Sequence, residues 1–247
     1  MRVDAALTNR FDEKDLKVEV KGSVVAVIDV IRATSSIAAL FGSGVKKVTV
    51  ASTLEKAYMF KKKDPQKLLC GEVNGHPPEG FDYGNSPLDF SRLDLSGRQA
   101  ILKTTNGTAS FLRAGKSPAV YSLAALNFRV TLEKVLQEAK KLNKDILFIC
   151  SGELGKIAYD DAYIAGLAVR DIMKTSGNFE FSDSSKLVLS AVLGDTDLKS
   201  ALEKSTSAIS LRGVGLGDDI GLCARLNEYN LVIKAVIEDN IPQLQLD

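Results

Sequence analysis

The sequence predicts an α/β protein in which helices cover both faces of a mostly parallel sheet. Three observations predict this layered fold. Short apolar runs alternate along the chain with segments that carry helix-start signals, which is typical of parallel βαβ units. The run Ser23–Asp29 is almost wholly apolar and β-branched, as in a strand buried on both faces. The length of 247 residues also allows a full core.

The first half of the chain contains most of the expected strands. They lie at Val3–Leu7, Lys17–Val20, Ser23–Asp29, Lys47–Val50, Lys67–Cys70 and Gln99–Lys103. Helices are expected from Thr34, where hydroxyl residues precede an apolar run, after a capping box at Ser52–Glu55, and over Ala109–Ala114. Between them, Gly71–Pro87 contains four glycines, three prolines and no apolar periodicity, so we predict a long loop of the kind that often carries function.

The second half begins after a turn-like stretch at Ser117-Pro118, which we take as the boundary between lobes of residues 1–118 and 119–247. Strands are expected at Ala119–Ser122 and Asp145–Cys150, and helices over about 127–142 and 158–173. Residues 184–226 are expected to be mainly helical. Leu231–Ile237 is a last strand or a buried helix, and its periodicity does not distinguish the two.

The composition excludes several classes of protein. The 32 basic and 31 acidic residues supply no field that would bind nucleic acid. No apolar run approaches the ~18 residues of a membrane span, and the charged N-terminus lacks the apolar core of a signal peptide. Three scattered cysteines make neither a disulfide framework nor a zinc site. We therefore expect a cytoplasmic protein, with a symmetric homo-oligomer as the general expectation.

Polar residues gather where the predicted strands end. In a parallel sheet these carboxyl ends share one edge, where ligands of open α/β sheets bind. The cluster consists of Asp29, Arg32, Glu72, Thr104–Thr108, Ser122, Ser151 and Gly152, followed by Asp160 and Asp161. Oxygen ligands of this kind suit Mg²⁺, and hydroxyl-rich helix starts suit phosphate or sulfonate. Together they predict metal-assisted phosphoryl chemistry.

We assign roles within this cluster as hypotheses. Asp29, Glu72, Asp160 and Asp161 would hold or surround Mg²⁺, whereas Arg32 with Thr34, Ser35 and Ser36, and Thr105, Asn106, Gly107 and Thr108, would bind the anionic groups. Asp29, Arg32 and Asp161 are the candidate catalytic residues. Whether Asp29 is a nucleophile or only a ligand is open. Ile31 stands where haloacid-dehalogenase phosphatases have a second Asp, which favours a metal-activated water.

Other interpretations stay open at this point. Asp29 with Arg32 could be a structural ion pair, and Asp160-Asp161 could be a charge pair at a helix start. Arg212 is an anion clamp or part of a solvated loop. Cys150 lies in a segment close to a cysteine-phosphatase loop, but Lys156 replaces the required Arg, and a buried structural cysteine is the alternative.

The well-known phosphate-binding motifs are mostly absent from the sequence. There is no GxxxxGK[ST] loop and no GxGxxG motif after a strand. The lone His76 in a proline-rich loop favours a surface or loop-packing residue over a base, and a serine triad is hard to build from it. A binding protein or sensor that uses the same pocket without turnover is the non-enzymatic alternative.

Taken in order, these clusters resemble one family over most of the chain. The motifs that carry the resemblance are DVIRATSS at Asp29–Ser36, GE at Gly71-Glu72, GFDYGNSP at Gly80–Pro87, TTNGT at Thr104–Thr108, LN at Leu126-Asn127, CSG at Cys150–Gly152, DDAYIAG at Asp160–Gly166, SLRGVGLGDDIGLCAR at Ser210–Arg225 and the closing Ile241-Pro242. GFDYGNSP and TTNGT are the specific ones. The sequence is similar to the 2-phosphosulfolactate phosphatase family.

The resemblance implies a Mg²⁺-dependent phosphatase that converts 2-phospho-3-sulfolactate to 3-sulfolactate and phosphate in coenzyme M biosynthesis, and an α/β fold with two unlike lobes. It adds substrate-binding roles for Asn85, Ser86, Asn127, Ser151, Gly152 and Arg212. Two positions depart from the family pattern, because Val73-Asn74 replace Arg and Gly, and Asp160 replaces Glu. The first change removes a cation that would face the substrate, so another small phosphorylated acid is the alternative substrate.

Overall fold

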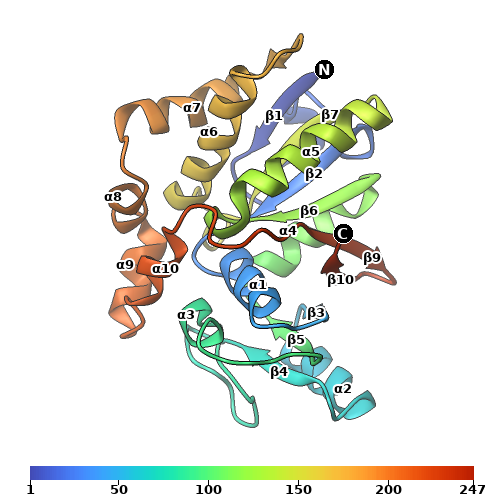
Figure 1. Cartoon of the computed structure of the whole chain (residues 1–247), viewed down its shortest axis with the longest axis vertical. Coiled ribbons are helices and arrows are strands. Elements are labelled where there is room, and N and C mark those ends of the chain that lie inside the picture. The colour runs from blue at the N-terminus through green and yellow to red at the C-terminus, as the bar shows by residue number, and fades with distance from the viewer.

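A single sheet of ten strands runs through the protein in a computed structural model that describes residues 1–247 (Figure 1). The strands are β1 (Arg2–Ala6), β2 (Ser23–Ile28), β3 (Lys47–Ala51), β4 (Leu68–Gly71), β5 (Gln99–Lys103), β6 (Ala119–Leu123), β7 (Asp145–Cys150), β8 (Glu180–Phe181), β9 (Ile233–Glu238) and β10 (Ile241–Leu246). Their order across the sheet is β4-β5-β3-β10-β9-β6-β2-β7-β1-β8. The α/β class is therefore confirmed.

The sheet consists of two parallel groups of strands that run in opposite directions. β4, β5 and β3 form one parallel group, and β6, β2, β7, β1 and β8 form another. The antiparallel hairpin of β9 and β10 joins them, because β10 pairs with β3 and β9 pairs with β6. Strands from both halves of the chain thus lie side by side in one sheet. Two lobes are not shown, and the boundary at residue 118 stays a prediction.

Ten α-helices accompany the sheet. They are α1 (Ala33–Gly42), α2 (Leu54–Lys63), α3 (Pro87–Phe90), α4 (Gly107–Arg113), α5 (Phe128–Leu142), α6 (Tyr159–Met173), α7 (Asp183–Gly194), α8 (Leu198–Glu203), α9 (Thr206–Gly213) and α10 (Asp219–Cys223). Figure 1 shows α7 to α10 along one side of the molecule, and α2 with β3, β4 and β5 at its lower end. The expected helices in 184–226 and the long loop after β4 are confirmed.

Two apolar layers sandwich the central strands. Alternate residues of β2 point to opposite faces: Val24, Ala26 and Ile28 pack with α5 and α6, whereas Val25 and Val27 pack with α1 and α4. Every residue of β2 is buried, as its apolar run predicts. This packing fixes the carboxyl end of β2, where Asp29 follows, in the middle of the sheet.

One expected strand is wrong, and two observed strands had no prediction. Lys17–Val20 is not a strand: residues 20–22 form a 3₁₀ helix, and both edges of the adjoining β2 are already paired with β6 and β7. The ambiguous run Leu231–Ile237 contains the strand β9, and its partner β10 and the two-residue β8 had no prediction. The Ile241-Pro242 pair lies in β10, where a proline hides the strand pattern.

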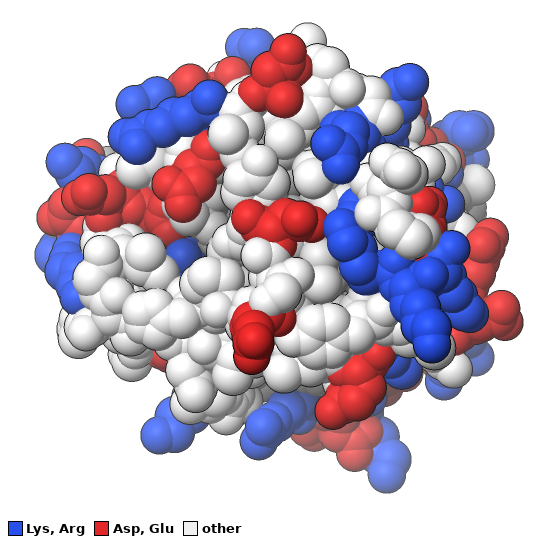
Figure 2. Space-filling view, turned by 90° about the horizontal axis from the view of Figure 1, so that it is seen from below, with Lys and Arg blue, Asp and Glu red and all other residues white.

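The remaining surface features are simple. No helix is long and apolar enough to cross a membrane. Figure 2 shows that basic and acidic side chains are interspersed over the face that is seen from below.

Candidate functional site

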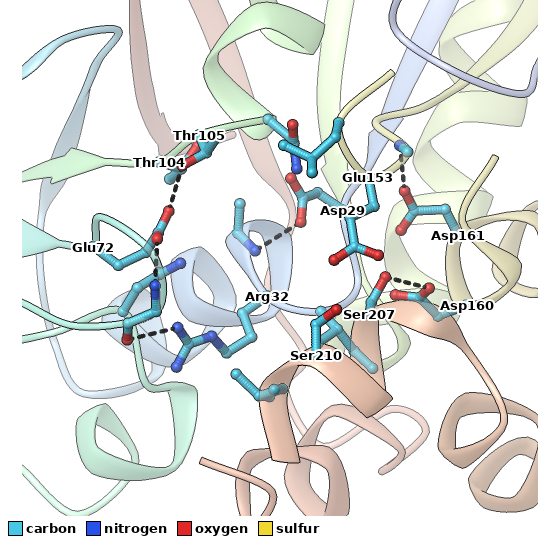
Figure 3. Close-up of a pocket in the computed structure, with 18 of the residues that line it drawn as sticks. Asp29, Arg32, Glu72, Thr104, Thr105, Glu153, Asp160, Asp161, Ser207 and Ser210 are labelled. Carbon is cyan, nitrogen blue, oxygen red and sulfur yellow. Dashed lines mark hydrogen bonds between the residues drawn. The ribbon is translucent and has the colours of Figure 1, made fainter. Parts of the chain in front are cut away.

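One cavity of about 350 Å³ lies at the carboxyl ends of β2, β4, β5 and β7 (Figure 3). The residues that follow these strands line it, together with the first turn of α6 and one side of α9. Nine predicted site residues come together here: Asp29, Arg32, Glu72, Asn85, Thr105, Asn106, Gly152, Asp160 and Asp161. The shared-edge rule explains this only within each parallel group, because three antiparallel pairings make β4 and β5 run opposite to β2 and β7. The cavity nevertheless brings together the residues that follow both pairs of strands.

Asp29 lies at the centre of the cavity, directly after β2. Its Oδ1 accepts a hydrogen bond from the Ala33 N–H at 3.0 Å, so the first turn of α1 orients the carboxylate. Burial raises the pKa of Asp29 to about 6, and the negative charge of Glu72 adds to the rise. Gly107 packs against it, because a Cβ at that position would come within 3.1 Å of Asp29 Oδ2 and 2.7 Å of Ala33 Cβ. A larger residue at 107 would displace Asp29.

The hydroxyls at the start of α1 do not line the cavity. Thr34 Oγ1 donates to the carbonyl of Asp29 at 2.8 Å, Ser35 Oγ to that of Val30 and Ser36 Oγ to that of Asn85. All three residues are fully buried. They fix the loop that carries Asp29 and Arg32, and substrate contact by them stays a prediction.

Arg32 is a buried cation that already has a partner. Its Nη1 lies 2.9 Å from Asp219 Oδ2, and its Nη2 donates to the Gly75 carbonyl at 3.4 Å. Asp219 also accepts from the Ser86 hydroxyl at 2.5 Å. The ion pair between Asp29 and Arg32 that the sequence left open is therefore not formed, because Arg32 pairs with Asp219 of α10.

Glu72 is held on the opposite side of Asp29 from α6. Thr105 Oγ1 donates to its Oε1 at 2.8 Å, and the Gly75 N–H donates to its Oε2 at 2.9 Å. The Lys103 ammonium donates to the Glu72 backbone carbonyl at 2.9 Å. Both carboxylate oxygens therefore have partners within the protein.

Asp160 and Asp161 differ although they are adjacent. Asp161 accepts from the Val30 N–H at 2.8 Å and from the Gly152 N–H at 2.9 Å, so both oxygens are used. Asp160 accepts from Ser207 at 2.9 Å, and its Oδ2 is buried without a partner. Burial raises the pKa of Asp160 to about 7 and that of Asp161 well above its usual range, with neighbouring carboxylates adding to both.

Sequence reasoning missed Glu153 and the α9 side of the cavity. Glu153 lies in the loop after β7, lines the cavity and has a buried Oε2 with no partner. In Figure 3 its carboxylate points into the space between Asp29 and Ser207. It follows the predicted Ser151-Gly152 pair directly, so the strand-end rule could have found it. Ser207 and Ser210 gave no such signal, because they lie on a helix far from any strand end.

Other predicted site residues do not line the cavity. Thr108 donates to the Ala51 carbonyl, Asn127 bonds backbone groups near Ala124, and Ser151 bonds Ser110. Ser86 caps α3, and Arg212 donates to the Glu203 carbonyl on the surface. These side chains build the walls, and direct contact with a substrate stays a prediction for each of them.

The thiol alternative finds no support in the structure. Cys150 is fully buried in β7 and does not line the cavity. Burial raises its pKa well above the usual range, and the nearby charges of Asp161 and Asp160 act in the same direction. A thiol of this kind is not a nucleophile.

The donor set fits a magnesium ion bound partly by its ligand. No group of three or more His, Cys, Asp or Glu side chains forms a closed metal cage. Mg²⁺ typically takes only one or two carboxylates and completes its shell with water and substrate oxygens. Asp29 and Asp160 suit that role best. Only Oδ1 of Asp29 accepts a backbone hydrogen bond, and Oδ2 of Asp160 has no partner. Glu72 and Asp161 have both oxygens engaged and suit it less.

Comparison with known proteins gives one consistent result. The family model described as 2-phosphosulpholactate phosphatase matches residues 10–237. A probable 2-phosphosulfolactate phosphatase of Deinococcus radiodurans is 32% identical over 220 residues, covering 89% of this chain and 90% of that protein. Proteins of the same description from Thermus thermophilus and Clostridium perfringens are 32% identical (82% and 84% covered) and 29% identical (95% and 93% covered).

Proposed function

The chain belongs to the 2-phosphosulfolactate phosphatase family, and from this premise we propose that it is a Mg²⁺-dependent phosphatase that hydrolyses 2-phospho-3-sulfolactate to 3-sulfolactate and phosphate, a step of coenzyme M biosynthesis. The observation that carries the proposal is the cavity itself. It combines buried carboxylates that have unpartnered oxygens with one guanidinium and several neutral donors, beside the carboxyl ends of β2, β4, β5 and β7.

The metal would be held by Asp29 and Asp160. When bound, Mg²⁺ would neutralise charge on the phosphoryl group and lower the pKa of a bound water. The reaction adds water to phosphorus, breaks the bond between phosphorus and the C2 oxygen, and leaves a proton on that oxygen. The chain's own task is to orient these groups, since positioning and electrostatics dominate phosphoryl transfer.

Neutral and cationic donors would orient the phosphoryl oxygens. Asn85 and Asn106 line the cavity with amide groups, and Arg32 adds a guanidinium that Asp219 holds in place. Asp161 would act indirectly, because its two hydrogen bonds hold the backbone after β2 against the backbone after β7. Asp29 and Glu153 therefore keep their places relative to each other.

One observation favours a second substrate class with the same chemistry. Five carboxylates line the cavity: Asp29, Glu72, Glu153, Asp160 and Asp161. The only lining cation, Arg32, is already paired with Asp219. A phosphorylated acid with fewer negative charges than 2-phospho-3-sulfolactate would meet less repulsion here.

The test is release of inorganic phosphate from 2-phospho-3-sulfolactate with Mg²⁺ and with EDTA, beside 2-phosphoglycerate and simple phosphomonoesters. We expect metal-dependent release, and loss of it in Asp29→Asn. Release from other esters only would keep the chemistry and reject the substrate. Binding by calorimetry without release from any ester would reject the enzyme and favour the sensor.

A further inference from the structure

We propose that Glu153 is a specificity-determining residue whose carboxylate accepts a hydrogen bond from a hydroxyl or ammonium group on the organic part of the substrate. It would disfavour a second strong anion at that place. The inference rests on the proposed phosphatase activity, and within it favours the second substrate class named above over the sulfonated ester: phosphorylated acids that carry a neutral or cationic donor beyond the phosphate.

The backbone beneath Glu153 is fixed. The Glu153 N–H donates to the Lys156 carbonyl at 3.0 Å, and the Lys156 N–H donates back to the Glu153 carbonyl at 2.9 Å, closing a tight turn. Leu154 and Gly155 occupy its left-handed positions, with φ of 52° and 81°. Just before the turn, the Gly152 N–H is bound to Asp161. The side chain of Glu153 therefore starts from a rigid point at the cavity wall.

The carboxylate of Glu153 is free to bind a ligand. Its Oε2 is buried and has no partner, and no lysine or arginine forms an ion pair with it. The hydroxyl of Ser207, which lines the same cavity, already donates to Asp160. A buried acceptor without a donor is destabilising, and a donor on the ligand would satisfy it.

The residue next to Glu153 and parts of the cavity wall suit the carbon skeleton of a substrate better than its phosphate. Leu154, directly after Glu153, lines the cavity while 68% of its surface stays exposed. Leu211 and Val214 line the same cavity, Val214 beside Gly75. These apolar groups offer contact to carbon atoms and nothing to a phosphoryl oxygen. Glu153 would therefore meet the group that the skeleton carries away from the phosphate.

The negative charge of Glu153 distinguishes between the two kinds of group that a substrate could place beside it. A hydroxyl or ammonium group would satisfy the free oxygen of Glu153, whereas a sulfonate has only acceptor oxygens and would repel it. No free cation lines the cavity to offset that repulsion, since Arg32 is bound to Asp219.

The decisive experiment compares two substrates that share one skeleton. 2-Phosphoglycerate differs from 2-phospho-3-sulfolactate only in a C3 hydroxyl in place of the sulfonate. We expect wild-type kcat/KM to be at least tenfold higher for 2-phosphoglycerate. In Glu153→Gln the ratio should shift toward the sulfonated ester by at least tenfold, mainly through KM. Glu79→Gln removes one charge from an exposed loop outside the cavity and should leave the ratio unchanged.

An unchanged ratio in Glu153→Gln would overturn the inference. If that variant also loses Mg²⁺ affinity tenfold by calorimetry, Glu153 is a metal ligand instead. If the wild type releases phosphate from neither ester, the proposed activity fails separately. In that case the ratio of the dissociation constants of the two esters can be measured instead of the ratio of kcat/KM. If Glu153→Gln leaves that ratio unchanged, the proposed role of Glu153 is again rejected.

Discussion

Replacing Asp29 with asparagine should make the protein less active and, without metal, more stable. The variant keeps the shape of the side chain and an oxygen that can accept from the Ala33 N–H. It loses the negative charge that we expect to hold Mg²⁺. We therefore expect kcat to fall by at least ~100-fold, a loss typical of removing one strong electrostatic group from an active site.

The gain in stability follows from the pKa of Asp29. Burial and Glu72 raise the pKa of this carboxyl from 3.8 to about 6, so folding opposes its ionisation. At about 1.4 kcal/mol per pKa unit, the ionised form costs about 3 kcal/mol of folding free energy. This cost is absent below pH 3.8, grows as the pH rises, and is complete above about pH 6. The amide side chain of the Asp29→Asn variant never ionises, so that variant should gain up to about 3 kcal/mol near pH 8 and nothing near pH 4.

Thermal and urea unfolding in EDTA, at pH 4 and pH 8, would measure this difference. A gain of about 3 kcal/mol corresponds to a rise in Tm of roughly 6–12 °C for a chain of this size. Saturating Mg²⁺ should stabilise the wild type and leave the variant unaffected. The reasoning fails if the metal-free variant is less stable than the wild type at pH 8, or if its turnover stays near normal.

Three further expectations concern the ion pair, the thiol and the metal. Asp219→Asn leaves Arg32 buried without its partner and should lower the unfolding free energy by about 3–5 kcal/mol in urea; a loss below about 1 kcal/mol would contradict the pairing. Cys150→Ser should keep kcat within about threefold, and an inactive but folded variant would restore the thiol mechanism. Mg²⁺ must displace protons from Asp29 and Asp160, whose pKa values are about 6 and about 7, so its Kd by calorimetry should weaken at least tenfold from pH 8 to pH 5. A constant Kd would exclude both carboxylates as ligands.

The sequence was sufficient for most strands of the sheet and for many of the residues that line the cavity. Apolar runs predict parallel strands well, because a strand buried on both faces tolerates few polar residues. That the two parallel groups run in opposite directions, so that their strand ends do not share one edge, was not predicted. The β9–β10 hairpin was harder to predict. Its residues alternate between buried and half-exposed, and Pro242 interrupts the pattern. Nothing local indicates that such a hairpin joins two parallel groups in mid-sheet.

Side-chain roles within the site needed the three-dimensional structure. Thr34 to Ser36 suggest anion binding by their position before an apolar run, yet their hydroxyls bond backbone carbonyls. Arg32 finds its counter-ion 187 positions away, at Asp219, and no spacing rule reports that contact. Ser207 reaches Asp160 from α9 for the same reason. Pairings of this range depend on how helices pack.

The contrast between Asp160 and Asp161 shows how one sequence feature divides into two functions. Successive residues at the start of α6 point in different directions, about 100° apart around the helix axis. Asp161 faces the two strand-end loops, and their N–H groups occupy both of its oxygens. Asp160 faces α9 and keeps Oδ2 unpartnered beside the cavity. The first carboxylate thus holds the loops that carry Asp29 and Glu153, and only the second is available for a cation. We therefore expect Asp161 to have a structural role and Asp160 alone to be a metal ligand, instead of both acting as a pair of ligands.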